Sequence, residues 1–402
     1  MYLCGMIISN IKRIVALLIF SALILSTSFI ADAAEVTVGA ARIDLYKPWL
    51  EGRRVALLSN HTGMVGSKHT LDLLLENNVD VVTLFSPEHG FRGTADAGQH
   101  VASSVDEVTG IPIASLYNGG KRGPSPEVMA GVDVILVDLQ DVGTRFYTYY
   151  ITMLDVMEAA ARHGKSVIVL DRPNPLGMSV DGPVLDMKLR SGVGRLPIPV
   201  LHGLTLGEMA KMAVGEGWLS GASELDLKVV PCKDYTHSTR YALPVAPSPN
   251  LRSMKAIYLY PSLCYFEGTT ASVGRGTDMP FLVYGHPLMK ARGFSFTPRS
   301  VPGAKNPPLR DKRCNGVDLR EVDDEAAIDG GVDLSYIIDA YNSMTQGKSR
   351  FFNSFFDKLI GNTKIRPMIE AGRSADEIKA TWRDEVAQFK KLRSRYLLYP
   401  EQ

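Results

Sequence analysis

Four short apolar runs, each followed at once by a polar loop that contains glycine or proline, constrain the fold of this chain most strongly. The runs cover residues 54–59, 79–85, 132–139 and 167–170. Helical patterns lie at 70–76, 147–163 and 205–214, and another apolar run lies at 225–230. Strands that alternate with helices form βαβ units, whose strands pair in parallel and whose loops gather at one sheet edge. The pattern predicts an α/β protein with a mostly parallel sheet.

The loop behind the second run carries the densest group of reactive side chains. Pro87 lacks a backbone N–H and restricts the residue before it, so we expect it to end the strand. Glu88 and His89 follow just beyond the strand, and Arg92 and Asp96 come soon after. Open α/β sheets bind ligands beyond the carboxyl ends of their strands. We therefore predict that this loop is the centre of the functional site; a surface turn with incidental charges is the alternative.

Polar residues of the same kinds recur in the loops behind the other strands and in later segments. We predict that they bind the substrate together with His89, Arg92 and Asp96. The further residues are Asn60, His61, Gln140, Asp141, Arg145, Asp171, Arg172, Asn174, His202, Asn250 and Arg275. Arginine binds carboxylates through two parallel hydrogen bonds, so the arginines of this set suit an anionic substrate. For each arginine, an ion pair that braces its loop against a neighbouring aspartate is the alternative.

The sequence does not indicate a metal, nucleotide or nucleic-acid site. Histidines and aspartates share these loops, but neither H-E-x-x-H nor His-x-His spacing supports a metal site. No G-x-G-x-x-G follows the first strand, and G-x-x-x-x-G-K-[ST] does not occur. Lys and Arg total 44 against 43 Asp and Glu, which leaves no basic excess for a nucleic-acid backbone. We predict no cofactor, no metal and no nucleic-acid partner.

The first 34 residues have the pattern of an export signal. Lys12 and Arg13 precede the apolar run 14–25, and the segment ends at 31–34 with an A-x-A site. This apolar core is shorter than the ~20 residues that a membrane-spanning helix needs. We predict that the signal is cleaved, and that the mature protein is periplasmic or secreted without stable membrane insertion. A retained membrane anchor is the alternative.

Cysteine usage leaves the redox state open. Beyond Cys4 in the predicted signal, the chain has Cys232, Cys264 and Cys314 and no C-x-x-C pair. This predicts neither a disulfide framework nor a cysteine zinc site, and it leaves room for one disulfide with one free thiol.

Two glutamates form a candidate acid–base pair. Glu88 lies between a proline and a histidine, whereas Glu267 lies between Phe266 and Gly268 at the end of an aromatic run. An acid beside apolar rings tends to keep its proton, as a general acid must, while an acid among donors stays ionised. Glycosidic bond cleavage commonly uses such a pair, and we interpret Glu267 as the proton donor. A structural salt bridge at each glutamate is the alternative.

Five motifs then occur in one order along the chain. They are Ser86–Gly93, Asp138–Tyr147, Asp171–Pro175, Pro247–Asn250, and Phe266–Thr269 with Gly274–Thr277. In their residues and their order, these motifs resemble those of the exo-β-N-acetylmuramidases of the NamZ type. This is a family of glycoside hydrolases formerly classed as a domain of unknown function. The resemblance covers essentially the whole mature chain.

The resemblance implies a fold and an activity. It implies a Rossmann-like, mostly parallel α/β sheet domain, which we place at residues 35–250, and a second, smaller α+β C-terminal domain at 251–402 that closes the active-site groove. Three prolines within 244–249 favour an extended crossing between the two. The implied activity is release of terminal β-N-acetylmuramic acid from the non-reducing ends of peptidoglycan fragments in cell-wall turnover and recycling. The catalytic residues carried over are Glu88 and Glu267.

The lactyl ether of muramic acid carries a carboxylate, which gives the loop arginines a function of their own. A cationic pocket could select this acid over plain N-acetylglucosamine. One alternative function is a non-catalytic periplasmic binding protein for a cell-wall sugar, which would bind without turnover. Another is a metal-dependent amidase or phosphatase, which would lose activity in chelator.

Overall fold

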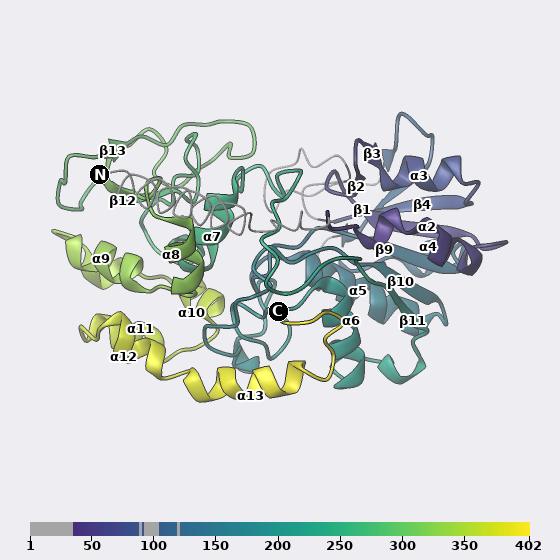
Figure 1. Ribbon diagram of the computed structural model, residues 1–402. Helices are drawn as coiled ribbons and strands as arrows, with labels where there is room; N and C mark the ends of the chain where they lie inside the picture. Colours follow the sequence, from purple (N-terminus) through teal and green to yellow (C-terminus); the bar gives the residue numbers. More distant parts are fainter. Residues whose placement is uncertain (1–34, 88–90, 92–103, 119–120) are drawn as a thin grey trace, which may run out of the picture. The chain divides into compact units, whose positions relative to one another are not determined.

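A seven-stranded sheet organises the N-terminal part of the computed structural model, which describes residues 35–87, 91, 104–118 and 121–402 (Figure 1). Its strands are β1 (Val55–Ser59), β4 (Val81–Ser86), β5 (Ser104–Val105), β6 (Pro112–Ser115), β9 (Val134–Asp138), β10 (Ser166–Leu170) and β11 (Leu227–Val230). They lie in the order β11-β10-β9-β1-β4-β6-β5. All neighbours pair in parallel except β5 and β6, which are antiparallel. The predicted α/β class with a mostly parallel sheet is confirmed.

The central strands are apolar on both faces, as a covered parallel sheet requires. In β1, Val55 and Leu57 pack into one hydrophobic core, while Ala56 and Leu58 pack into the core on the other face. All four side chains are fully buried. Because both faces of the sheet are buried, its central strands are continuous apolar runs and do not alternate between apolar and polar residues.

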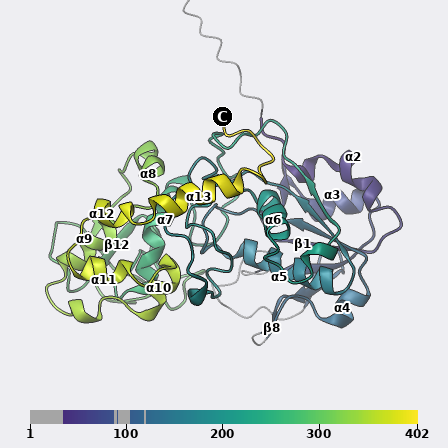
Figure 2. The same ribbon diagram turned by 90° about the horizontal axis from the view of Figure 1, so that it is seen from below.

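Helices cover both faces of the sheet (Figures 1 and 2). The short α2 (Ile43–Tyr46) and α3 (Thr70–Glu76) contribute Tyr46, Leu71 and Leu74 to the core that contains Val55. Helices α4 (Pro126–Ala130), α5 (Tyr149–Arg162) and α6 (Leu206–Gly215) contribute to the core on the opposite face. The helical patterns at 70–76, 147–163 and 205–214 all correspond to helices.

Local signals set the ends of these helices. Thr205 begins α6 with a capping box, in which its side chain accepts from the backbone N–H of Glu208 and Glu208 accepts from the N–H of Thr205. Gly164 follows α5 with φ +61°, a left-handed conformation that glycine adopts without strain. Helix α5 begins two residues later than its apolar pattern, at Tyr149.

The C-terminal part is an α+β arrangement, as predicted. Strands β12 (Val283–His286), β13 (Ser295–Phe296) and β14 (Cys314–Asp318) form an antiparallel sheet in the order β12-β14-β13. The helices are α7 (Met254–Leu263), α8 (Asp324–Gly330), α9 (Ser335–Ser343), α10 (Ser354–Ile360), α11 (Ile365–Glu370), α12 (Ala375–Ala380) and α13 (Arg383–Arg393). The helical pattern from 375 onwards is two helices, separated at Trp382, whose indole N–H donates to Asp181.

Short elements fill the connections. Strands β2 (Met64–Val65) and β3 (Lys68–His69) form one hairpin, and β7 (Tyr117–Asn118) and β8 (Lys121–Arg122) form another. The 3-10 helices are η1 (Gly39–Ala41), η2 (Lys47–Trp49), η3 (Met187–Leu189), η4 (Ala222–Glu224), η5 (Cys264–Gly268) and η6 (Lys348–Arg350).

Residues Thr37–Gln402 belong to one compact unit. Its larger hydrophobic core runs continuously from Ile135 in β9 to Phe356 in α10, so the two parts share buried surface. The predicted boundary at residue 250 remains a prediction. The export signal predicted at 1–34 lies outside the described residues and also remains a prediction. Among the described helices, none is long and apolar enough to cross a membrane.

The topology marks one position along the sheet edge. The chain runs from β1 outward to β4 and β6 and then returns to β9 on the other side of β1. Ligands of open α/β sheets bind beyond the carboxyl ends of the strands at such a reversal. The loops that leave β1 and β9 there begin with Asn60 and Leu139.

Candidate active site

A cavity of about 190 Å³ brings together residues from three of the predicted motifs. It is lined by Phe146, Tyr147, Thr148, Tyr149, Val193, Ser248, Leu251, Tyr260, Glu267, Arg275, Phe281 and Phe355. Six of these twelve residues are aromatic, and Glu267 and Arg275 provide the charges. It therefore combines stacking surfaces for a sugar ring with a carboxylate that can exchange a proton.

Glu267 lies in η5, directly after α7, and one of its oxygens pairs with Nε of Arg275. The thiol of Cys264 lies 4.0 Å from its other oxygen. The Glu267 side chain is 25% exposed, and the Arg275 guanidinium lies 5.1 Å from the centre of the Phe281 ring. Burial would lower the pKa of Arg275, but the charge of Glu267 and its hydrogen bond outweigh burial and raise this pKa.

The sequence predicts an apolar environment for the Glu267 carboxyl, and the ion pair with Arg275 shows a charged one instead. The neighbouring Phe266 is fully buried and stacks on Tyr284 at 4.8 Å, so its ring belongs to the core. The carboxylate itself contacts a guanidinium. An apolar environment is thus no reason to assign Glu267, rather than Glu88, as the proton donor.

The other predicted catalytic residue, Glu88, lies outside the described residues, together with His89, Arg92 and Asp96. The chain on either side of 88–90 is described. Ser86 ends β4 and is buried, and the buried Phe91 packs edge-on against His69 at 5.3 Å. His69 in turn contacts the Asn60 carbonyl at 2.8 Å. The described flanks of the Glu88 loop thus lie at the same sheet edge as Asn60.

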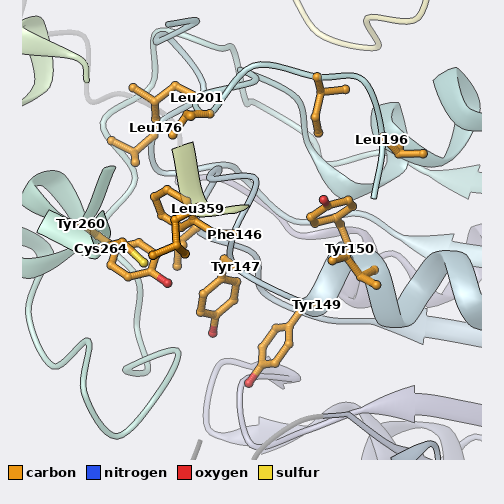
Figure 3. Packing of buried hydrophobic residues seen from close by; sticks show 14 of the residues in the cluster. Phe146, Tyr147, Tyr149, Tyr150, Leu176, Leu196, Leu201, Tyr260, Cys264 and Leu359 are labelled. Carbon is orange, nitrogen blue, oxygen red and sulfur yellow. The ribbon is translucent and has the colours of Figure 1, made fainter. Parts of the chain in front are cut away.

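Asn60 is buried and supports the cavity wall from behind. Its amide nitrogen donates to the Tyr149 hydroxyl at 2.7 Å, and its amide oxygen accepts from the backbone and hydroxyl of Thr62. The Tyr149 and Tyr147 hydroxyls donate to the Pro247 carbonyl at 3.3 and 2.8 Å. Figure 3 shows these two tyrosines side by side with their hydroxyls on the same side. The predicted role of Asn60 in substrate binding is therefore indirect.

Arg172 is one of two predicted arginines whose guanidinium is buried within the protein. It donates to both carboxylate oxygens of Asp138, one of them at 2.9 Å, and both side chains are almost inaccessible. Asp138 also accepts from the hydroxyl of Thr70 at 2.6 Å. This is the loop-bracing ion pair of the alternative interpretation, and it leaves no surface of Arg172 for a substrate.

Arg145 is the second predicted arginine whose guanidinium is buried within the protein. It has no exposed surface, and its guanidinium donates to the carbonyls of Pro183, Ile198, Leu359 and Ile360 at 2.7 to 3.1 Å. Burial lowers its pKa to about 10. Leu359 and Ile360 end helix α10, so the guanidinium satisfies carbonyls that a helix end leaves unpaired. Arg145 thus joins α10 to the N-terminal part through its hydrogen bonds.

Three further loop residues, Gln140, Asn174 and Asp171, are buried with intramolecular partners. Gln140 donates to the carbonyls of Asp141 and Pro173 at 2.9 and 2.8 Å. Asn174 donates to the Leu204 carbonyl at 2.9 Å. Asp171 accepts from Thr205, Gly207 and Tyr399, and burial raises its pKa to about 6 despite these donors. These contacts shape the loops at the sheet edge instead of facing the cavity.

His202 is buried and neutral. Its Nδ1 accepts from the backbone N–H of Leu204 at 3.1 Å. Burial, together with the positive charges of Arg393 and Arg145, lowers its pKa to about 3. His202 is 1% exposed, and its predicted role in substrate binding remains a prediction. Of the predicted substrate-binding residues that the structure describes, Arg275 is the one that lines the cavity.

Asp141 is buried at the start of the loop that leads to Tyr147. One carboxylate oxygen accepts from the N–H of Gly143 at 2.7 Å, and the other has no hydrogen-bond partner in the part of the chain that the structure describes. Burial raises its pKa from the usual 3.8 to about 7, against the opposing effect of nearby backbone N–H groups. In the folded protein this carboxyl therefore stays protonated at pH values well above those at which an ordinary aspartate loses its proton.

We expect Asp141→Asn to become more stable relative to the wild type as pH rises. Between about pH 4 and about pH 7 the folded protein keeps a proton that the unfolded chain has released. Wild-type stability therefore falls as pH rises through this window, whereas asparagine does not titrate. Thermal melts at about pH 4 and about pH 8 measure the difference. A melting-temperature difference that stays constant across this range would contradict the raised pKa.

The sequence did not single out several cavity residues. Ser248, Tyr260 and Phe281 line the cavity, and the signal that could have indicated Ser248 is a hydroxyl between two prolines in the motif Pro247–Asn250. Asn250, which was predicted instead, is buried and donates to the Gly303 carbonyl at 2.9 Å. The aromatic residues carried no signal, because a ring in a core and a ring in a cavity wall look alike in sequence.

The described cysteines form no disulfide. Cys232, Cys264 and Cys314 are free and buried. Within the described ranges, no three His, Cys, Asp or Glu side chains are grouped so that they could hold a metal ion. A reaction without metal or cofactor remains a prediction.

Comparison with known proteins gives agreement over nearly the whole chain. The family model described as exo-β-N-acetylmuramidase NamZ, N-terminal, matches residues 55–255, and its C-terminal counterpart matches 258–399. The peptidoglycan β-N-acetylmuramidase NamZ of Bacillus subtilis (strain 168) is 39% identical over 372 residues, which cover 88% of this chain and 89% of that protein.

Two crystal structures of DUF1343 family proteins from Bacteroides fragilis NCTC 9343 have the same fold. One has a TM-score of 0.86 and 54% identity, and the alignment covers 92% of this chain and 100% of that one. The other has a TM-score of 0.75 and 29% identity, with 90% and 99% covered. Together, the matches of both family models and the identity to the Bacillus protein show that the chain belongs to the NamZ family of exo-β-N-acetylmuramidases, which are glycoside hydrolases.

Proposed function

We propose that the protein is an exo-acting β-N-acetylmuramidase that releases terminal N-acetylmuramic acid from the non-reducing ends of peptidoglycan fragments, in cell-wall turnover and recycling. The observation that carries this proposal is the position of Glu267, a carboxylate paired with Arg275 in the wall of an aromatic cavity. The named activity of the Bacillus relative supports the peptidoglycan substrate. The description of the two family models supports the exo mode of action.

The cavity size also favours action at a chain end. At about 190 Å³ it is smaller than the ~300–1,000 Å³ typical of pockets for drug-sized ligands. Such a space suits one terminal sugar better than several consecutive sugars of a glycan strand. Phe355, which is half-buried, offers an apolar face to the sugar ring, and Glu267 and Arg275 line the same cavity.

In the proposed reaction, Glu88 and Glu267 share the acid and base roles. One carboxyl group gives its proton to the glycosidic oxygen as the bond to the anomeric carbon breaks. The other either takes a proton from the attacking water or attacks the anomeric carbon itself, and water then hydrolyses the ester. A carboxyl separation of ~6.5–9.5 Å corresponds to the first route and inversion, and ~5–5.5 Å corresponds to the second and retention.

The test compares a chromogenic β-N-acetylmuramide with the matching β-N-acetylglucosaminide. We expect turnover of the muramide, much slower turnover of the glucosaminide, and rates unchanged by a metal chelator. Equal rates on both sugars would contradict the proposed specificity. Loss of turnover in chelator would favour a metal-dependent hydrolase, and tight binding of muropeptides without turnover would favour a binding protein.

A further inference from the structure

The segment 246–250, which crosses between the two parts of the chain, is fixed by three sets of contacts. The His61 ring contacts the Ala246 carbonyl at 2.9 Å. Tyr147 and Tyr149 both donate to the carbonyl of the next residue, Pro247. The side chain of Asn250 holds the far end through Gly303. Because the neighbours on both sides are held, the residue between them has a defined position.

That residue is Ser248, which lines the same cavity as Glu267. Its Oγ accepts from the backbone N–H of Asn250 at 3.4 Å, and its carbonyl accepts from the N–H of Leu251 at 3.2 Å, which closes a tight turn. The side chain is 7% exposed. The hydroxyl proton has no acceptor among the described residues. Ser248 can therefore donate to a ligand without first breaking a hydrogen bond to one of them.

Arg275 brings further donors to the same cavity. Its Nε is used by Glu267 and one face of its guanidinium covers Phe281. No hydrogen bond links its two terminal nitrogens to a described residue, and 20% of the side chain is exposed. These nitrogens form the end-on fork that binds a carboxylate through two parallel hydrogen bonds. The ion pair and the ring hold this fork in a fixed orientation.

We propose that Ser248 and Arg275 together bind the lactyl carboxylate of the terminal sugar, and that Ser248 is a specificity-determining residue. This inference rests on the proposed function, whose substrate differs from N-acetylglucosamine by this carboxylate. An ionised carboxylate only accepts hydrogen bonds, and the cavity offers it an O–H and a guanidinium fork. A glucosaminide has a single hydroxyl at that position and cannot use all of these donors.

The chain contains a matched control for Ser248. Ser191 makes the same kind of turn: its Oγ accepts from the N–H two residues on, that of Val193, at 3.4 Å, and it pairs with the residue three positions on. Ser191 does not line the cavity, although Val193, whose N–H it accepts from, does, so this control also reports the effect of loosening a turn at the cavity wall. Ser248→Ala and Ser191→Ala thus remove equivalent turn contacts, but only the first removes a donor from the cavity. Ser248→Thr keeps a hydroxyl.

The experiment measures kcat and KM for the chromogenic muramide and for its neutral lactyl methyl ester. For Ser248→Ala we expect KM for the acid to rise about 10-fold or more, the size of one hydrogen bond to a charged group. We expect KM for the ester to change less than about 2-fold and kcat to be retained. Ser248→Thr should restore most of the affinity, and Ser191→Ala should resemble the wild type.

An equal shift for acid and ester, or the same shift in Ser191→Ala, would overturn the proposal, because both outcomes mean that Ser248 only shapes the turn. Failure of the proposed function has a different signature, in which the wild type turns over neither compound. In that case calorimetric binding of free N-acetylmuramic acid to the wild type and to Ser248→Ala decides the inference. Equal affinities would then refute it.

Discussion

Replacing Glu267 with glutamine is expected to lower kcat for the chromogenic muramide by at least about 100-fold, the lower range for loss of a general acid or base. Glutamine keeps the shape of the side chain and can still accept the hydrogen bond from Arg275, but it cannot exchange a proton. The folded structure should therefore remain. Steady-state kinetics together with a thermal melt of the variant measure both effects.

The control for this variant is Glu158→Gln. Glu158 also pairs with an arginine, Arg195, at 2.6 Å and is 17% exposed, but it does not line the cavity. Its substitution weakens a comparable ion pair without removing a reacting group, so kcat should remain near that of the wild type. If both variants lose activity equally, the loss at Glu267 reflects a general effect of breaking an ion pair.

Glu88→Gln is expected to have an effect of the same size as Glu267→Gln, because the mechanism needs one acid and one base. The two variants together test the pair. If Glu88→Gln stays near the wild-type rate while His89→Ala or Asp96→Asn abolishes turnover, the proton transfers belong to these neighbours and the mechanism with two glutamates is wrong.

Replacing Arg172 with methionine is expected to lower the free energy of unfolding by about 3–5 kcal/mol, the usual cost of removing one partner from a buried ion pair. The reason is Asp138, which is fully buried and, among the described residues, would keep only the Thr70 hydroxyl as a side-chain partner. Urea denaturation followed by circular dichroism gives the change. Adding Asp138→Leu to the same chain should recover much of the loss, because no unpaired charge then remains.

An exposed pair with the same geometry provides the comparison. Arg54 also donates to both oxygens of an aspartate, Asp133, at 3.0 and 2.8 Å, but both side chains are open to solvent. Arg54→Met should change stability far less, since water replaces the lost partner. Comparable losses in Arg54→Met and Arg172→Met would show that burial of Asp138 is not the cause.

Arginine in these loops illustrates what a sequence leaves open. Its guanidinium has five N–H donors, which bind carbonyls, carboxylates of the protein and carboxylates of a ligand equally well. Arg145 finds carbonyls more than 200 residues away in α10, Arg172 finds Asp138, and only Arg275 of the described three keeps donors for the cavity. No local pattern distinguishes these outcomes, because each partner comes from a distant segment.

The sequence by itself determined the class of fold, because strand runs buried on both faces and helices with one apolar face are local patterns that only a covered parallel sheet satisfies. The motif order likewise determined the family. Only the tertiary structure decided which polar residues face the cavity. Asn60, Asn250 and Arg145 became supports and Ser248 became a wall residue, since burial and hydrogen bonding depend on the loops that pack around each side chain, and those loops meet only when the chain has folded.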